Sequence, residues 1–187
     1  MKKNLLFLPV LMFAFTSAAN AHGPVRQKAD EEITINAPAA KVWGIIKDYG
    51  DMSWLPAVKN TTVDKGNEIG SIRVLTLQDG GTITEELKKY DADKMAYGYK
   101  ITEMSTAKTI THAGNEEKVP VLPVDNYTAN IGVEAKGDTS VVTWKGAYYR
   151  AYTNNNPPAE MNEDAANKAV ADVFKAGLAN LKTLAEK

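Results

Sequence analysis

The chain of 187 residues contains no cysteine. Disulfide bonds, thiol nucleophiles, thiolate metal ligands and haem attachment through cysteine are therefore all excluded. Histidine is almost as scarce, because only His22 and His112 could supply an imidazole to catalysis or to a metal. The sequence thus carries few groups for acid–base or redox chemistry of its own.

Recognisable catalytic motifs are missing as well. There is no G-x-S-x-G serine motif and no H-E-x-x-H metal motif, and residues 66–70 lack the lysine and the helix of a phosphate-binding loop. Glu85 and Glu86 are neighbours in a predicted strand, so their side chains point to opposite faces and cannot easily share one substrate. We therefore predict a protein that is not an enzyme and that has no resident cofactor.

Positive charge does not exceed negative charge. The chain has 22 basic and 23 acidic residues, which gives a formal net charge of −1. Proteins that bind nucleic acid gather many basic residues on one face. We therefore expect no nucleic-acid partner, and no strong electrostatic steering of a protein partner.

A long apolar run occurs only near the N-terminus. Two lysines precede the apolar run at 5–15, which leads into a small-residue cleavage pattern ending at Ala21. The run is shorter than the roughly 20 residues that span a bilayer, so we interpret residues 1–21 as a secretory signal peptide. The mature chain is then expected in the periplasm, as a single domain over residues 22–187.

Cleavage after Ala21 would place His22 at the new N-terminus. Its amine and its imidazole could then bind copper together with His112. An N-terminus without a metal is the simpler expectation, because chain ends are commonly unstructured. We therefore predict no metal site.

What the sequence does contain is a regular alternation of apolar and polar residues. This alternation, interrupted by glycine turns, predicts seven strands at 29–35, 61–66, 71–77, 82–90, 95–101, 127–133 and 142–148. Large apolar side chains share one face of the later strands, such as Tyr97 with Tyr99 and Trp144 with Tyr148. The opposite face is mostly polar or small, as expected of a sheet with one face in water.

Helical patterns flank these strands. Pro38 begins a short predicted helix through Lys47, and a second short helix is expected around Trp54. From about Met161 to Leu184, apolar residues recur at helical spacing and predict one long C-terminal helix. A glycine within this apolar stripe, Gly177, would let the helix approach a sheet closely. This order of elements predicts an α+β fold with a curved antiparallel sheet of about seven strands wrapped around the long helix, and the two short helices over its mouth.

Three segments carry a resemblance to a known superfamily. They are "ITINAPAAKVWGIIKDYGDMSWLPAVKN" at 33–60, "VVTWKGAYYRAY" at 141–152 and "AGLANLKTLAEK" at 176–187. These segments and the order of elements resemble the START and Bet v 1-like (SRPBCC) superfamily, in particular its polyketide cyclase/dehydrase branch. The resemblance implies the helix-grip fold, in which the sheet and the long helix enclose a cavity.

Two further segments, at 119–131 and 154–166, resemble a narrower group. This group comprises the periplasmic accessory proteins of bacterial methanol oxidation. The resemblance implies two protein partners, methanol dehydrogenase and the cytochrome that accepts its electrons. It also implies a non-catalytic role in promoting electron transfer between them.

A helix-grip cavity would be covered and lined by large side chains. Trp54 and Leu55 are expected to form a lid over its mouth. The candidate lining residues are Tyr97, Tyr99, Tyr127, Trp144, Tyr148 and Phe174. Such a lining would suit a small hydrophobic or quinone-like ligand, which gives the alternative function of a carrier or a cyclase-like binder. Each of these aromatic residues could equally be ordinary core packing.

Two connections are candidates for partner binding. Residues 104–125 are predicted to form a loop that is longer than usual, and they carry Lys108 and His112. Residues 148–160 carry the other candidates, which are Tyr149, Arg150 and Tyr152. Tyrosine and arginine are enriched in interface hot spots. The alternative for the second connection is a structural link that orients the last helix.

Overall fold

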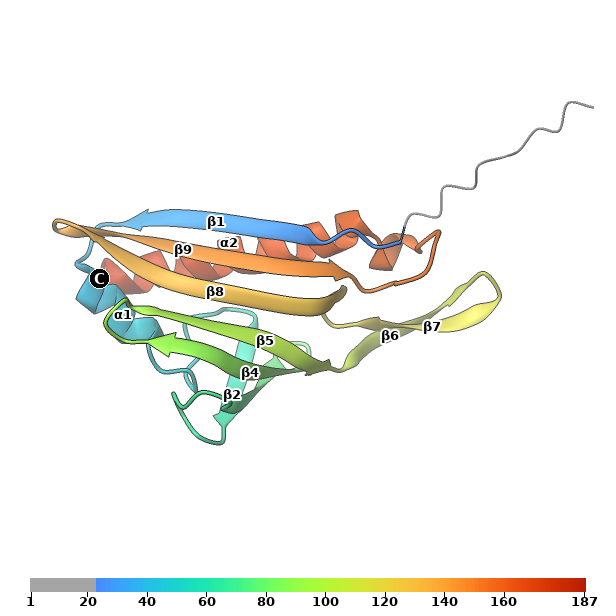
Figure 1. The fold of residues 1–187 in the computed structure, drawn as a ribbon, viewed down its shortest axis with the longest axis horizontal. Helices are drawn as coiled ribbons and strands as arrows, with labels where there is room; N and C mark the ends of the chain where they lie inside the picture. Colours follow the sequence, from blue (N-terminus) through green and yellow to red (C-terminus); the bar gives the residue numbers. More distant parts are fainter. Residues whose placement is uncertain (1–22) are drawn as a thin grey trace, which may run out of the picture.

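The computed structural model describes residues 23–187, so the predicted signal peptide and His22 lie outside the described residues. A large antiparallel sheet forms one layer, and the long helix α2 runs along one of its faces (Figure 1). In chain order the elements are β1 (Gln27–Ile35), α1 (Ala39–Ile46), β2 (Val58–Val63), β3 (Ile72–Leu77), β4 (Thr82–Asp91), β5 (Ala96–Met104), β6 (Thr106–His112), β7 (Asn115–Pro120), β8 (Val124–Lys136), β9 (Thr139–Arg150), the short 3₁₀ turn η1 (Ala159–Met161) and α2 (Glu163–Ala185).

The sheet has seven strands in the order β1-β9-β8-β5-β4-β3-β2, and its neighbouring strands are antiparallel. The seven predicted strands are confirmed, although β2 begins and ends three residues before the predicted range 61–66. Strand β1 is one edge strand of this sheet, and it pairs with β9 from Gln27 opposite Tyr148 to Ile35 opposite Ser140. The α+β class and the long C-terminal helix are likewise confirmed.

Helix α2 begins at a well-formed cap. The Asn162 side chain accepts a hydrogen bond from the Ala165 backbone N–H at 2.8 Å, and Glu163 and Asp164 occupy the first turn. An acceptor cap and early acidic residues both favour a helix start. Further along, a Cβ atom added to Gly177 would lie only 2.9 Å from Trp144 Cζ3. The predicted close approach of helix and sheet at Gly177 is therefore confirmed.

Only one of the two predicted N-terminal helices forms. After α1, residues 47–57 make a series of turns, which we call the turn segment. Asp48 and Asp51 accept hydrogen bonds from the backbone N–H of Gly50 and Ser53, each at 2.9 Å. Aspartate side chains that bond the backbone two residues ahead compete with helix formation. The prediction of a second helix was wrong because these local bonds favour turns.

The prediction of a long loop at 104–125 was also wrong. Strands β6 and β7 pair as a separate antiparallel hairpin, which projects from one end of the large sheet (Figure 1). Its two turn residues, Ala113 and Gly114, have φ angles of 49° and 82°. Two residues with positive φ form the tight turn that suits a hairpin, although alanine rarely occupies the first position. Within residues 23–187, no helix is long and apolar enough to cross a membrane.

Candidate functional site

A cavity of about 180 Å³ lies between the sheet, the turn segment and α2. It is lined by Met52, Leu55, Ala57, Val58, Leu75, Leu77, Ile83, Glu85, Tyr99, Ile101, Val121, Leu122, Tyr127, Trp144 and Val173. Most of these side chains are apolar, and Glu85 is the one charged residue of the lining. The cavity therefore combines a hydrophobic wall with a single carboxyl group.

The lining divides into a buried floor and a partly exposed rim. Leu75, Glu85 and Tyr99 are buried, at 3%, 4% and 4% exposure. The rim is formed by side chains that still reach solvent, which are Ala57, Leu77, Ile101, Val121, Leu122 and Val173. The carboxyl group thus sits at the inner end of an apolar opening.

Glu85 is held by a buried arginine on the neighbouring strand. Arg73 on β3 lies opposite Glu85 on β4, and its Nε donates a hydrogen bond to Glu85 Oε2 at 2.6 Å. Both side chains face the core because each shares its strand face with large apolar residues. The arginine side chain has no solvent exposure, and the glutamate side chain has 6%. The result is an ion pair inside the apolar core.

Arg73 is fixed from several directions at once. Its Nη1 donates to the carbonyl oxygen of Tyr49 at 3.0 Å and lies 3.0 Å from the sulfur of Met52. Its guanidinium carbon lies 4.1 Å from the ring centre of Tyr49 and 4.9 Å from that of Tyr99. Cation–π contacts of this kind gain strength when they are desolvated. Arg73 therefore ties the turn segment to the sheet as well as holding Glu85.

The two charges affect each other's protonation. Burial raises the pKa of Glu85 above its ordinary value, and the nearby Arg73 charge opposes that shift. Burial alone would lower the pKa of Arg73, but Glu85 and the surrounding tyrosines raise it overall, so the guanidinium stays charged. In the described part of the chain, Arg73 Nη2 and the Tyr49 hydroxyl have no hydrogen-bond partner. The cluster thus keeps unused polar capacity beside the cavity.

Four of the eight predicted ligand-binding residues line the cavity, namely Leu55, Tyr99, Tyr127 and Trp144. The wall between β5 and β9 is fixed by a hydrogen bond from Trp144 Nε1 to the Tyr99 hydroxyl, 3.1 Å long. Because Tyr99 accepts this bond, its own proton can be donated to another acceptor, and the neighbouring Tyr127 hydroxyl is one such acceptor.

The other four predicted ligand-binding residues are buried outside the cavity lining. Phe174 stacks on Trp144 with ring centres 4.2 Å apart, and the Tyr148 hydroxyl donates to Asn167 Oδ1 at 3.1 Å. Tyr97 packs edge-on against the ring of Tyr49 at 6.0 Å. These side chains act as core packing in this structure.

Trp54 and Leu55 do not form an outer lid. Trp54 is 1% exposed, and its ring centre lies 5.3 Å from that of Trp144. The carbonyl oxygen of Trp54 accepts a hydrogen bond from Asn180 of α2 at 2.8 Å. The turn segment therefore inserts Trp54 between helix and sheet as a core contact, while the buried Leu55 lines the cavity from the turn segment, so the expectation of an outer lid is corrected.

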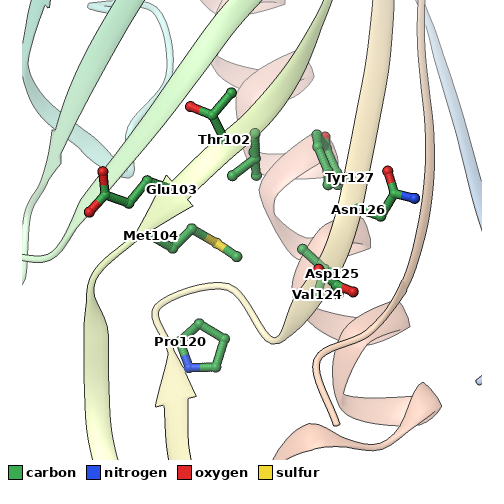
Figure 2. A pocket seen from close by; sticks show the side chains of 9 residues that line it. Thr102, Glu103, Met104, Pro120, Val124, Asp125, Asn126 and Tyr127 are labelled. Atoms are coloured by element: carbon green, nitrogen blue, oxygen red, sulfur yellow. The ribbon is translucent and has the colours of Figure 1, made fainter. Parts of the chain in front are cut away.

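A second hollow, of about 190 Å³, opens where the sheet splits. Strands β5 and β8 pair only as far as Lys100 opposite Thr128. Figure 2 shows the side chains that line this gap, with Glu103 and Met104 on the β5 side and Tyr127 on the β8 side. The hollow shares Ile101 and Tyr127 with the apolar cavity. These two side chains therefore separate the cavity from the outer hollow.

The predicted partner-binding residues fall into two groups. His112 and Lys108 of the hairpin reach the connection before α2, where His112 Nε2 lies 2.7 Å from the Asn156 carbonyl oxygen. The His112 ring also stands edge-on to Tyr152 at 5.4 Å, and Lys108 pairs with Glu160 at 3.4 Å. The two predicted regions thus form one surface. We call Lys108, His112, Tyr152, Asn156 and Glu160 the hairpin surface.

Arg150 and Tyr149 lie apart from this surface. Arg150 is 3% exposed, and it donates to the carbonyl oxygens of Tyr152 at 2.7 Å and Asn154 at 2.8 Å while pairing with Glu163. Its guanidinium is therefore committed to the connection and unavailable to a partner, which corrects its predicted role. Tyr149 faces the other side of the sheet, with Arg26 positioned 5.4 Å from its ring centre.

The Arg73–Glu85 pair is the main feature that sequence reasoning missed. Alternation places Arg73 on the same strand face as Leu75, and Glu85 on the same face as Ile83 and Leu87. Opposite charges at core-facing positions of adjacent strands could therefore have predicted a buried ion pair. Within residues 23–187, no group of three or more histidine, aspartate or glutamate side chains is placed to hold a metal ion.

Comparison with known proteins finds one matching family and several similar folds. The model of the family described as polyketide cyclase/dehydrase and lipid transport matches residues 26–186. No curated protein matches the chain. A solved structure of an uncharacterised protein from Bacillus thuringiensis is similar, with a TM-score of 0.67 and 22% identity over 86% of this chain and 100% of that protein.

Two plant proteins share the fold at lower identity. Norcoclaurine synthase from Thalictrum flavum, solved with dopamine and hydroxybenzaldehyde, has a TM-score of 0.56 and 14% identity over 95% of this chain and 96% of its own. Major latex-like protein 151 from Panax ginseng has a TM-score of 0.62 and 14% identity, over 87% and 99% of the two chains. At these identities the likeness shows a common fold alone.

Proposed function

Since the chain belongs to the polyketide cyclase/dehydrase and lipid transport family, we propose that it is an exported binding protein. Its ligand is a small, mostly apolar molecule held in the cavity between the sheet, the turn segment and α2. The observation that carries this proposal is the apolar lining of that cavity around a single carboxyl group.

The volume of the cavity limits the size of the ligand. An apolar cavity of about 150 Å³ engineered into another protein core binds benzene. The cavity described here measures about 180 Å³, which suits a molecule built on one ring. Norcoclaurine synthase offers a parallel, because that protein holds dopamine and hydroxybenzaldehyde within the same fold.

The residues of the lining favour binding over catalysis. Glu85 is the only carboxyl group of the lining, and its Oε2 atom is already engaged by Arg73. A general acid or base needs to exchange its proton readily with the substrate. A carboxylate that is held by a buried arginine is poorly suited to that task. We therefore favour a carrier over a cyclase-like enzyme.

This proposal can be tested by nuclear magnetic resonance with phenol as a one-ring probe. Phenol should shift the backbone amide signals of the cavity residues and leave those of the outer sheet face unchanged. Val173 lies on the rim, so Val173→Trp should fill the cavity and abolish the shifts. Ala176→Trp adds the same side chain at an exposed position of α2 and should leave binding intact.

Either of two results would count against the proposal. One is the lack of any phenol-dependent shift in the folded wild-type protein. The other is equal binding by wild type and Val173→Trp, which would place the probe outside this cavity. Thermal melting of both variants checks that each is folded.

We further propose a role in methanol oxidation. In this role the exported protein resembles MxaD and promotes electron transfer from methanol dehydrogenase to its cytochrome acceptor without catalysing a reaction itself. The sequence resemblance at 119–131 and 154–166 supports it. A further support is the hairpin surface, where the projecting hairpin contacts the second of these segments through His112 and Asn156.

A cytochrome-reduction assay with methanol dehydrogenase tests this role. The purified mature protein should raise the rate, and Lys108→Glu should lower that stimulation. Lys145→Glu is the matched control, since both lysines are exposed and each pairs with an acidic residue, Lys145 with Asp30 on the outer sheet face. No stimulation by the wild-type protein at any salt concentration would reject the role. Equal effects of the two variants would reject the hairpin surface as the contact.

A further inference from the structure

An apolar cavity that binds hydrocarbon alone has no use for a charged group at its floor. We propose that Glu85, held by Arg73, is a recognition group for a hydrogen-bond donor on the ligand. The cavity then selects uncharged one-ring molecules that carry a hydroxyl group over hydrocarbons of the same size. This inference rests on the proposed ligand-binding function.

The arrangement around Glu85 leaves one oxygen for a ligand. Arg73 approaches through its Nε alone and bonds Oε2 at 2.6 Å, while its Nη1 is directed to the Tyr49 carbonyl oxygen. The carboxylate is therefore fixed in position by one oxygen. A carboxylate has about four acceptor sites, so Oε1 retains the capacity to accept a bond from the cavity side.

The charge balance of the site favours a neutral ligand. The positive guanidinium and the negative carboxylate neutralise each other within the same buried cluster. A ligand that brought its own charge into this apolar space would lose its hydration without a free opposite charge, which is costly. A hydroxyl group avoids that cost because it can donate a hydrogen bond while it remains neutral.

Tyr99 complements Glu85 as a second polar contact. Both residues belong to the cavity lining, and they lie on the adjacent strands β4 and β5. The Tyr99 hydroxyl accepts from Trp144 Nε1 at 3.1 Å, and its proton can be donated either to the neighbouring Tyr127 hydroxyl or to a ligand. A ligand hydroxyl can then donate to Glu85 and accept from Tyr99, which satisfies both of its functions.

A purely structural role explains the pair less well. Replacing a buried ion pair by apolar residues of similar volume is often neutral or stabilising, so stability alone does not require it. The pair also ties the turn segment to the sheet, but that contact runs through Arg73 and the Tyr49 carbonyl oxygen. It does not require a carboxylate that forms part of a cavity wall.

The test compares three one-ring probes on the wild-type mature protein by isothermal titration calorimetry. Phenol donates a hydrogen bond, anisole has the same ring with its donor blocked by a methyl group, and toluene has no polar atom. Hydrogen bonds to a charged group are worth about 1.5–3 kcal/mol, so phenol should bind about tenfold more tightly than the other two, or more. Equal affinities for all three probes would overturn the inference while leaving the proposed function standing.

A double variant supplies the second arm of the test. Arg73→Met with Glu85→Leu removes both charges together and keeps the core apolar, whereas a single change would leave one buried charge unpaired. In this variant the preference for phenol should disappear, and toluene should bind at least as tightly. A retained preference for phenol would overturn the inference. If the wild-type protein binds none of the probes, the proposed ligand binding fails and this inference fails with it.

Discussion

The inner face of the sheet has two halves that differ in packing. The packed half, formed by β1, β9 and β8 under α2, holds aromatic rings in direct contact, such as Phe174 stacked on Trp144 at 4.2 Å. The cavity half, formed by β2 to β5 under the turn segment, holds an ion pair and the greater part of the cavity lining. One continuous sheet thus carries a closely packed core and an apolar cavity side by side. The difference indicates that the two halves contribute to stability in different ways, one through ring packing and the other through a buried ion pair.

The largest expected effect comes from breaking the ion pair in the cavity half. Arg73→Ala would leave the Glu85 carboxylate buried without its partner, which typically costs about 3–5 kcal/mol. Urea unfolding of the mature protein measures the change in the free energy of unfolding. Lys145→Ala removes an exposed lysine that pairs with Asp30 at 2.9 Å and should cost less than about 1 kcal/mol. Similar small losses for both variants would mean that the cavity half is open to water.

A smaller effect is expected from adding a methyl group at the tight contact between α2 and the sheet in the packed half. A Cβ atom at Gly177 would lie 2.8 Å from Leu55 Cδ1 and 2.9 Å from Trp144 Cζ3. Overpacking of this kind costs about 1–3 kcal/mol, against a gain of about 1 kcal/mol in helix propensity. Gly177→Ala should therefore lower the free energy of unfolding, as measured by urea denaturation.

Gly44 provides the matched control for Gly177. It is also a helical glycine, in α1, but a Cβ atom added there meets nothing within 4 Å. Gly44→Ala should therefore stabilise the protein by up to about 1 kcal/mol through helix propensity alone. Stabilisation by both substitutions would show that the helix can move away from the sheet without cost.

The smallest expected effect is a dependence of stability on alkaline pH. Burial raises the pKa of Tyr97, Tyr99 and Tyr49 above the ordinary value near 10, although the Arg73 charge opposes the shift. Because the folded state keeps these phenols protonated, their contribution to stability is complete below pH about 10 and is lost as the pH rises above it. Melting temperatures and tyrosinate absorbance across this range measure the effect. Ordinary titration of Tyr49, Tyr97 and Tyr99 in a folded protein would show that the cavity half is solvated.

Much of the fold could be predicted from periodicity. Alternation in segments such as that around Tyr97 and Tyr99 locates strands, and the apolar stripe with Gly177 locates α2. Periodicity failed where short local bonds decide the outcome, as with Asp48 and Asp51 in the turn segment. It also failed at Ala113, because alanine is an unusual residue for a hairpin turn.

The candidate site was predicted less completely than the fold. Residue type alone did not distinguish Tyr99, which lines the cavity, from Tyr97, which packs outside the lining. Arg150 looked like an interface residue, yet its partners lie in a connection that has no periodic pattern. Arg73 and Glu85 were predictable in principle from the alternation of their strands. Cavity lining depends on how distant elements pack, which no single segment encodes.

The short linker between β7 and β8 joins the hairpin to the cavity. Its residues Val121 and Leu122 form part of the cavity rim, and Val121 N–H donates to the Ser105 carbonyl oxygen at the base of the hairpin, at 3.1 Å. If a partner shifted the hairpin, this linker would carry the movement to the rim. Linkage then requires reciprocity, so that a ligand in the cavity changes the partner's affinity by the same factor by which the partner changes the ligand's. In that case, ligand binding in the cavity would change how tightly the hairpin binds its partner.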